Sequence, residues 1–348
     1  MNSKHTDLYF PAEWHKQSMV QLTWPHANSD WYYMLEEVEA CFIEIAKAIS
    51  QRERLLVVTP EKQEVEKTLQ KAGATMKNII VFSCDTNDTW ARDHGFITLL
   101  DKNDGTPHYV DFCFNGWGLK FDAELDNAIN KQLYDSGILK GVYQSALAWV
   151  LEGGSIETDG KGTLLTTSQC LLAPDRNNML QYNLESALKT LLHCDRVLWL
   201  DYGNLIGDDT DGHIDTIARL APNDTIVYMA ADKNDEEQYY DLVMMEEQLQ
   251  SFRTADGKPY RLLALPSPAP IYDDDCQRLP ATYANFLIMN DAVLYPTYAQ
   301  PDNDAKAAEV LQAAFPDKEI VGIDCRALIQ QHGSLHCVTM QYPSPDKI

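Results

Sequence analysis

Residues 216–265 contain the pattern that decides the fold class of this chain. Two short apolar runs, TIARL at 216–220 and TIVYM at 225–229, precede a helical pattern and a third run, YRLLAL at 260–265. The β-branched and apolar residues of these runs predict strands. Between the second and third runs, apolar residues recur at helical spacing from Glu236 to Phe252. The order strand, strand, helix, strand predicts an α/β unit that leaves one apolar face to pack on a neighbour.

The same order recurs along most of the chain. The periodicity predicts helices over Trp31–Ser50, Glu61–Ala72, Ala123–Leu133, Leu180–His193, Glu236–Phe252 and Asn303–Phe315. Strands are predicted over Met19–Thr23, Leu55–Thr59, Ile79–Phe82, Phe96–Leu100, Tyr109–Phe114, Leu147–Leu151, Thr163–Thr167, Val197–Leu200, Thr216–Leu220, Thr225–Met229, Tyr260–Leu265, Ala284–Met289, Val293–Pro296 and Ile320–Ile323. No clear self-similarity accompanies this order. Several such units that close around an axis would bury all their apolar faces. The alternative architecture is an open doubly wound sheet, but the sequence has no G-x-G-x-x-G turn of the kind often found in such sheets.

Nothing in the sequence divides the 348 residues into separate domains. The nearest candidates for a boundary, Pro266–Pro270 and the acidic run Asp273–Asp275, are typical of one loop. We therefore expect a single domain over residues 1–348.

The charge balance narrows the class of partner. The chain has 28 Lys and Arg against 52 Asp and Glu, a formal charge of −24. Nucleic acids and anionic membrane surfaces need basic patches, so we expect neither as a partner. A negative field attracts cations and is compatible with a cationic substrate, although the charge could equally serve solubility alone.

The eight cysteines are scattered, with no C-x-x-C pair, which indicates reduced thiols rather than a disulfide framework or a zinc finger. Residues Met1–Phe10 carry no apolar secretion signal, and no apolar run approaches the length of a membrane span. We expect a cytoplasmic protein.

Three polar stretches could carry chemistry. The first, Asn87–Gly95, predicts a loop. In this loop a carboxylate beside the Trp90 indole could bind a planar cation. The alternative is a local salt bridge of Arg92 with Asp88 or Asp93. Asp208–Asp215 leads into a predicted strand, where residues two apart share a face.

On that basis His213 and Asp215 would project together, as a general acid/base pair or as metal ligands; an exposed acidic turn is the alternative. In His332–Met340, a Gly-Ser turn precedes a predicted strand that opens with Cys337. A cysteine there can serve as a thiolate nucleophile, although most cysteines are small buried hydrophobes.

Two weaker features complete the set. Glu152-Gly153-Gly154 indicates a bend or a close approach of the backbone, with Glu152 at a strand end. Asn285 lies in an apolar predicted strand, where a buried amide needs partners.

Taken in order, these segments resemble the agmatine deiminase branch of the guanidine-modifying enzymes, the pentein superfamily. The similar pieces are Pro11–Trp14, Thr23–His26, Asp88–Asp93, Glu152–Ser155, Asp209–Asp215, Asn285–Phe286 and Gly333–Thr339, and together they span Tyr9 to Pro343. The resemblance implies a five-bladed α/β propeller of ββαβ units around a pseudo-five-fold axis, with the active site near that axis.

The resemblance also implies roles for particular residues. It makes Cys337 the nucleophile, His213 the general acid/base, and Asp93 and Asp215 the clamps of a guanidinium group. Trp90 would line the substrate slot and Asn285 would lie near the thiolate, while Glu152 and Asp209 match acidic positions of the family. One departure is His332, where relatives often have glycine.

The activity implied is hydrolysis of agmatine to N-carbamoylputrescine and ammonia, in putrescine and polyamine biosynthesis, with no metal and no cofactor. An acidic mouth suits the ammonium of agmatine better than the carboxylate of free arginine; a bacterial-type peptidyl-arginine deiminase is the nearest competitor. The resemblance also admits a homodimer. From other classes, a metal-dependent hydrolase built on His213, Asp215, Asp209 and Asp93, or a non-catalytic binding module, stays open.

Overall fold

The computed structural model describes residues 7–345, which form five mixed sheets. In each sheet an antiparallel strand pair is joined to a parallel pair. The strands, in sheet order, are β1 (Leu8–Tyr9), β5 (Ile97–Asp101), β6 (Pro107–Cys113) and β7 (Val142–Val150); β17 (Thr339–Pro343), β2 (Gln17–Thr23), β3 (Leu55–Thr59) and β4 (Ile79–Ser83); β10 (Arg196–Leu200), β9 (Thr163–Thr167) and β8 (Ile156–Thr158); β11 (Ala218–Ala221), β12 (Thr225–Met229) and β13 (Arg261–Leu265); and β14 (Leu287–Ile288), β15 (Ala292–Thr297) and β16 (Glu319–Asp324).

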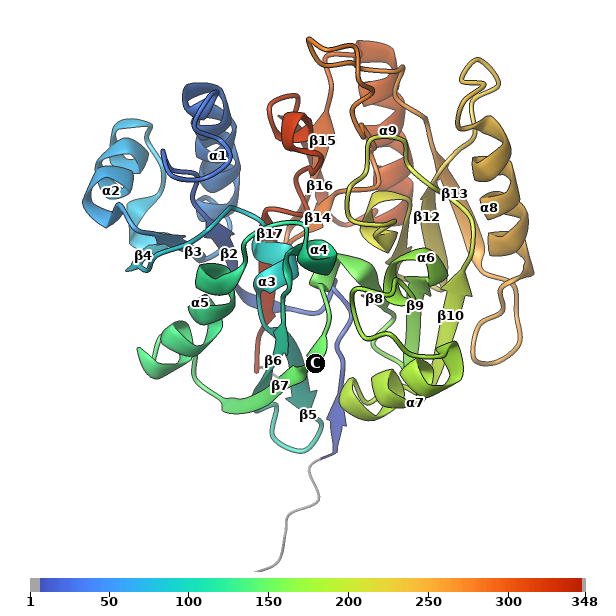
Figure 1. Cartoon of the computed structure of the whole chain (residues 1–348), viewed down its shortest axis with the longest axis horizontal. Helices are drawn as coiled ribbons and strands as arrows, with labels where there is room; N and C mark the ends of the chain where they lie inside the picture. The colour runs from blue at the N-terminus through green and yellow to red at the C-terminus, as the bar shows by residue number, and fades with distance from the viewer. Residues whose placement is uncertain (1–6, 346–348) are drawn as a thin grey trace, which may run out of the picture.

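The longer helices connect the parallel strands and lie toward the outside of the molecule, whereas the short helices α3 and α4 lie near its middle (Figure 1). The α-helices are α1 (Leu35–Ser50), α2 (Lys62–Lys71), α3 (Ala91–His94), α4 (Gly116–Leu119), α5 (Glu124–Asp135), α6 (Ser168–Leu171), α7 (Gln181–Leu191), α8 (Tyr239–Ser251) and α9 (Pro301–Ala314). Four short 3-10 helices are η1 (Met76–Asn78), η2 (Gly153–Ser155), η3 (Ile214–Thr216) and η4 (Leu328–Gln331).

The unit at residues 218–265 has the predicted order. Strands β11 and β12 form an antiparallel hairpin, α8 follows, and β13 pairs parallel to β12. All five residues of β12 are buried. This is expected, because β12 is the central strand of its sheet, between β11 and β13. Helix α8 turns Leu242, Met245 and Leu249 into the core, at the spacing that the sequence showed.

The two ends of the chain meet in one sheet. β17, near the C-terminus, pairs antiparallel with β2, so that Thr339 lies opposite Leu22. The last strand therefore supplies the antiparallel partner that β2 would otherwise lack.

Most predicted elements are confirmed, with three corrections. The strand predicted at Ala284–Met289 is only Leu287–Ile288, so Asn285 lies in the irregular segment before it. β7 begins at Val142, well before the predicted Leu147, and Glu152 follows its end at Val150. The short strands β1 and β8 were not predicted, because two or three residues carry no measurable alternation.

Within residues 7–345, no helix has both the length and the apolarity needed to cross a membrane. The prediction about an export signal concerns Met1–Phe10, of which residues 1–6 lie outside the described part.

Candidate active site

The candidate site residues share one position in the fold. Asp93 (in α3) precedes β5, Gly154 (in η2) precedes β8, Asp215 (in η3) precedes β11, Asn285 precedes β14, and Cys337 precedes β17. Each of these strands is the first of its ββαβ unit. The site is thus assembled from five equivalent segments, each of which leads into the first strand of one sheet unit; we call them entry segments.

A pocket of about 380 Å³, partly open to solvent, lies over Cys337 and Asp93. Its lining contains four carboxylates, two indoles and a phenyl ring, and no Lys or Arg among the residues that the structure describes: Asp30, Asp88, Trp90, Asp93, Trp117, Phe121, Asp209, Thr210, Gln331, His332, Gly333 and Cys337. Such a lining favours a cationic ligand with a planar or apolar part.

Asp93 is held by two hydrogen bonds. The backbone N–H of Gly154 donates to Oδ1 at 3.0 Å, and Trp117 Nε1 donates to Oδ2 at 2.9 Å. Burial, together with the nearby charge of Asp215, nevertheless raises the pKa of Asp93 well above its ordinary value. A cation placed beside this carboxyl would favour its ionised form and oppose the effect of burial.

Asp215 is the carboxylate that stays ionised. Burial alone would raise its pKa, but the hydrogen bond from His336 Nδ1 to Oδ2, at 2.7 Å, and nearby positive charge lower it overall. Its other oxygen, Oδ1, is buried and has no hydrogen-bond partner in the part of the chain that the structure describes. A buried acceptor without a partner is costly in a folded protein and points to a ligand that donates to it.

Cys337 is 4% exposed, and its Sγ lies 3.4 Å from Asn285 Oδ1 and 3.9 Å from Asp215 Oδ2. Burial, followed by the charges of Asp215 and Asp93, raises the pKa of this thiol well above its ordinary value. Asn285 Oδ1 also accepts the backbone N–H of His336 at 2.8 Å, which fixes the turn that carries the cysteine.

His213 is fully buried, and within residues 7–345 neither ring nitrogen has a hydrogen-bond partner. Its Nδ1 lies 3.7 Å from Asp93 Oδ1. Burial lowers the pKa of His213 to about 3, which favours the neutral imidazole. Gly154 makes room for it: a Cβ at that position would lie 2.6 Å from His213 Nδ1, 2.9 Å from Asp93 Oδ1 and 3.1 Å from Asp215 Oδ2.

Trp90 forms one wall of the pocket. Its Nε1 donates to Asp88 Oδ2 at 3.1 Å, and its ring lies 6.3 Å from that of Trp117 in an edge-on arrangement. A Cβ on Gly333 would come within 2.1 Å of the Trp90 ring, so the loop ahead of Cys337 requires glycine there.

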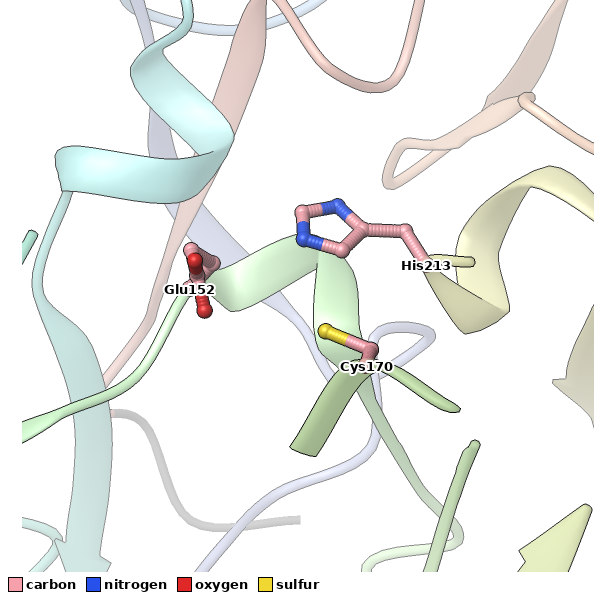
Figure 2. A group of neighbouring side chains, drawn as sticks. All are labelled: Glu152, Cys170 and His213. Carbon is pink, nitrogen blue, oxygen red and sulfur yellow. The ribbon is translucent and has the colours of Figure 1, made fainter. Parts of the chain in front are cut away.

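Behind His213, Glu152 and Cys170 complete a buried group whose ligand-type atoms lie within 4.8 Å of one another. Figure 2 shows the three side chains turned toward a common space. They could in principle bind a metal ion, but Arg176 Nε already donates to Glu152 Oε1 at 2.9 Å. A guanidinium thus supplies the positive charge that a metal would bring, and the same holds for the group Glu13, Glu157 and His336, where Arg219 binds both carboxylates. The absence of a metal requirement stays a prediction.

The sequence matches the model of the Porphyromonas-type peptidyl-arginine deiminase family over residues 9–343. The chain belongs to this family. Its members act on a guanidino C–N bond, so the chain is a hydrolase.

Three relatives illustrate the range of similarity. A structure solved as a candidate arginine deiminase from Porphyromonas gingivalis is 52% identical, with a TM-score of 0.91 and coverage of 97% of this chain and 99% of that one. Substrate-bound agmatine deiminase from C. jejuni is 36% identical, with a TM-score of 0.89 and coverage of 97% and 96%. Agmatine deiminase from Pseudomonas syringae pv. tomato is 31% identical over 364 residues, which cover 98% of this chain and 96% of that protein. The mixed α/β architecture agrees with these deiminase structures.

Within this family fold, the predicted site residues come together, but not by the predicted local geometry. His213 and Asp215 do not lie on a strand: His213 caps η3, and β11 begins only at Ala218. Asp211 and Gly212 have left-handed φ angles of 67° and 89°, which turn the chain sharply just before His213. The prediction that His213 and Asp215 share one face of a strand is therefore wrong, because the backbone is not extended there.

Two other local predictions are corrected. The loop predicted at Asn87–Gly95 contains the short helix α3, and the strand predicted to open with Cys337 begins at Thr339. Arg92 pairs with neither Asp88 nor Asp93; its Nη1 lies 3.0 Å from Glu13 Oε1.

The sequence interpretation missed Trp117, His336 and Arg176. Trp117 lies between two glycines and has a left-handed φ of 55°, and that Gly-Trp-Gly setting was the available signal. His336 adjoins Cys337 and could have been considered on that ground. Arg176 stands alone in a loop and carries no local signal.

Proposed function

We propose that this chain is an agmatine deiminase, which hydrolyses agmatine to N-carbamoylputrescine and ammonia. The observation that carries the guanidinium assignment is the set of buried acceptors around Cys337. Among the described residues, no group donates a hydrogen bond to Asp215 Oδ1 or to the ring nitrogen of neutral His213 that lacks a hydrogen. A guanidinium offers up to five N–H donors and no acceptor, so it complements these atoms and the carboxylate of Asp93.

Asp93 and Asp215 clamp the guanidinium and orient its central carbon toward Cys337 Sγ. The incoming positive charge favours the ionised forms of Asp93 and of the thiol, opposing the effect of burial on both pKa values. Trp90 lines the slot beside the planar group. Asn285 holds the cysteine turn, and Glu152 supports the region behind His213.

Neutral His213 accepts the proton of the Cys337 thiol, and the thiolate attacks the guanidinium carbon. The imidazolium returns that proton to the departing nitrogen, which leaves as ammonia and leaves a thiouronium on Cys337. His213 then takes a proton from water as the water attacks the same carbon. As the carbonyl forms, the C–S bond breaks and the hydroxyl proton of the intermediate is released, so that the ammonia leaves overall as ammonium. The proton held by His213 returns to the Cys337 thiolate, and the ureido product departs.

Agmatine is favoured over arginine by the charge of the pocket. The lining has Asp30, Asp88, Asp93 and Asp209, and no Lys or Arg among the described residues. The α-carboxylate of arginine would lose its water there without gaining a cationic partner, at a cost of at least about 3 kcal/mol. We expect a preference for agmatine of at least about 100-fold in kcat/KM.

The test is a panel of agmatine, free arginine and an arginine peptide, scored for the ureido product with and without EDTA. Comparable kcat/KM for arginine and agmatine would remove the substrate assignment and leave the mechanism. Activity lost in EDTA and restored by a divalent ion would support the metal-dependent hydrolase instead.

We also propose that the five sheets are the blades of a propeller around a pseudo-five-fold axis, in one catalytic domain. The five equivalent entry segments support this, because residues at the same place in each blade would converge at such an axis. A role in putrescine biosynthesis, a cytoplasmic location and a possible homodimer stay predictions. The structure has all eight cysteines as free thiols, and their reduced state in the cell stays a prediction.

A further inference from the structure

A chain of four buried hydroxyl groups joins the loop ahead of Cys337 to the segment that carries His213. None of the four residues is more than 5% exposed, and none lines the pocket over Cys337. A buried hydroxyl is costly unless it is hydrogen-bonded, so each of them needs a partner in the core. In order along the chain of bonds, the four residues are Ser334, Tyr298, Thr282 and Thr216.

Tyr298 is the centre of this hydroxyl chain. Its Oη donates to the carbonyl oxygen of Thr282 at 2.9 Å and accepts the Thr282 N–H at 3.2 Å. Ser334 Oγ lies 3.2 Å from the same Oη. A phenol hydroxyl has one donor and two acceptor sites. Because its hydrogen goes to Thr282, Tyr298 accepts from Ser334, and all three sites are in use.

Two threonines continue the hydroxyl chain toward His213. Thr282 Oγ1 donates to the carbonyl oxygen of Thr216 at 2.7 Å, and Thr216 Oγ1 donates to the carbonyl oxygen of His213 at 2.8 Å. Thr282 Oγ1 also accepts the Ala284 N–H at 3.1 Å, next to Asn285. The chain therefore joins three entry segments, those that lead into β11, β14 and β17.

At its other end the hydroxyl chain reaches Cys337 by two routes. Ser334 stands three residues before Cys337, and a hydrogen bond from its backbone partly offsets the effect of burial on the pKa of the thiol. Asn285 stands three residues after Thr282, and its Oδ1 accepts the Cys337 N–H at 3.3 Å. Both routes connect the backbone around the thiol to the Tyr298 hydroxyl.

We propose that Tyr298, through this hydroxyl chain, sets the spacing between the Cys337 thiol and the His213 base. The inference rests on the proposed function, in which His213 accepts the thiol proton. Proton transfer needs a fixed distance, and a misplacement of about 1 Å can cost on the order of 100-fold in rate. Tyr298 is a positioning residue, because it acts on the reaction only through the segments that it joins.

Tyr298→Phe tests the centre of the chain, because it removes the hydroxyl and keeps the ring. We expect kcat for agmatine to fall at least about tenfold as the thiol and the base lose their spacing. KM should change by about threefold or less, since Asp93 and the pocket lining are held by other contacts. Thr216→Val removes the last hydroxyl of the chain at nearly constant shape and should act in the same direction.

Tyr283 provides the matched control. It is fully buried beside Tyr298, with ring centroids 5.5 Å apart, but its hydroxyl donates to Asp304 Oδ1 at 2.6 Å, outside the chain. Tyr283→Phe should lose stability in thermal unfolding and keep kcat within about threefold of the wild type. An unchanged kcat in Tyr298→Phe, or equal losses of kcat in Tyr298→Phe and Tyr283→Phe, would overturn the positioning role.

A second measurement needs no substrate. Iodoacetamide reacts with the thiolate of Cys337, which forms as His213 takes the proton, and the mass of the Cys337 peptide gives the rate. This rate should fall about tenfold in Tyr298→Phe and in Thr216→Val and stay unchanged in Tyr283→Phe. Equal rates in all three variants would contradict the inference.

The two measurements separate this inference from the proposed function. If the wild type does not hydrolyse agmatine, the proposed function fails, and the alkylation rate still tests the spacing of Cys337 and His213. If thermal unfolding shows that Tyr298→Phe does not fold, Thr216→Val decides: a normal kcat together with a normal alkylation rate would overturn the inference.

Discussion

Replacing Gly154 by alanine should remove activity by crowding the catalytic groups. Gly154 does not have a left-handed φ, so alanine adds no backbone strain there. Its methyl carbon would lie 2.6 Å from His213 Nδ1, 2.9 Å from Asp93 Oδ1 and 3.1 Å from Asp215 Oδ2. Relaxed contacts of this kind lie near 3.5 Å, so the imidazole must retreat by about 0.9 Å and each carboxylate by a smaller distance.

A misplacement of about 1 Å at a reacting group can cost on the order of 100-fold in rate. We therefore expect kcat/KM for agmatine to fall at least about 100-fold in Gly154→Ala, which corresponds to about 2.7 kcal/mol. Overpacking should also destabilise the fold by about 1–3 kcal/mol. The assay is ureido product formation together with thermal unfolding at the same pH.

Gly322→Ala is the matched control. A Cβ there would lie 2.8 Å from Thr297 Cγ2, a similar clash, but in β16 and against an ordinary side chain. This variant should lose stability and keep kcat/KM. If Gly154→Ala keeps its kcat/KM within about threefold of the wild type, the idea that these three side chains are held in working positions around Gly154 is refuted.

Three further perturbations test other parts of the site. Cys337→Ser should remain folded and lose nearly all turnover, because a hydroxyl ionises far less readily than a thiol; activity within about tenfold of the wild type would exclude Cys337 as nucleophile. Asp93→Asn should lower kcat/KM for agmatine at least about 30-fold, since a bound cation would be half paired, and an unchanged value would contradict the clamp role. Burial raises the pKa of Asp88 to about 7, so this pocket carboxyl is neutral below that pH and ionised above it, and KM for agmatine should fall as pH rises through about 7. Asp88→Asn should flatten that step, and an unaltered profile would show that Asp88 does not act on the substrate.

Candidate site residues could be named from the sequence, and their roles stay predictions, but the local geometry around them could not be predicted. Cys337, His213 and Asp93 stand in short polar motifs that follow apolar runs, so each could be recognised locally. Their placement depends on tight turns, such as the left-handed Asp211 and Gly212 ahead of His213. Tight turns produce no hydrophobic periodicity in the sequence. The turn before His213 was therefore not recognised, and a strand-like placement was predicted there.

Long-range partners could not be predicted for a different reason. Glu13 and Arg92 are 79 residues apart, and His336 and Asp215 are 121 apart. A single sequence contains no signal for pairing at such separations. The equivalence of the five entry segments was also hidden, because the repeat lies in the order of elements and not in residue identity.

Three buried arginines form ion pairs beside the candidate site residues, and these ion pairs restrict the positions of the segments that carry them. Arg92 precedes Asp93 and binds Glu13, and Arg219 follows Asp215 and also binds Glu13, at 2.5 Å. Arg176 joins Glu152 to Asp211, which stands two residues before His213.

Buried ion pairs of this kind seldom stabilise a fold more than a well-packed apolar core would, because desolvation offsets most of their attraction. Their geometry, however, is strict, since a guanidinium donates its hydrogen bonds only in its plane. Arg92, Arg219 and Arg176 each hold a segment next to a residue that we propose as catalytic or as a clamp. Among the described residues, Asp215 Oδ1 and the ring nitrogens of His213 have no hydrogen-bond partner. Unsatisfied buried atoms reduce stability, and the rigid ion pairs around them keep the site in shape despite this cost. In the proposed function, the guanidinium of the substrate supplies hydrogen bonds to these atoms.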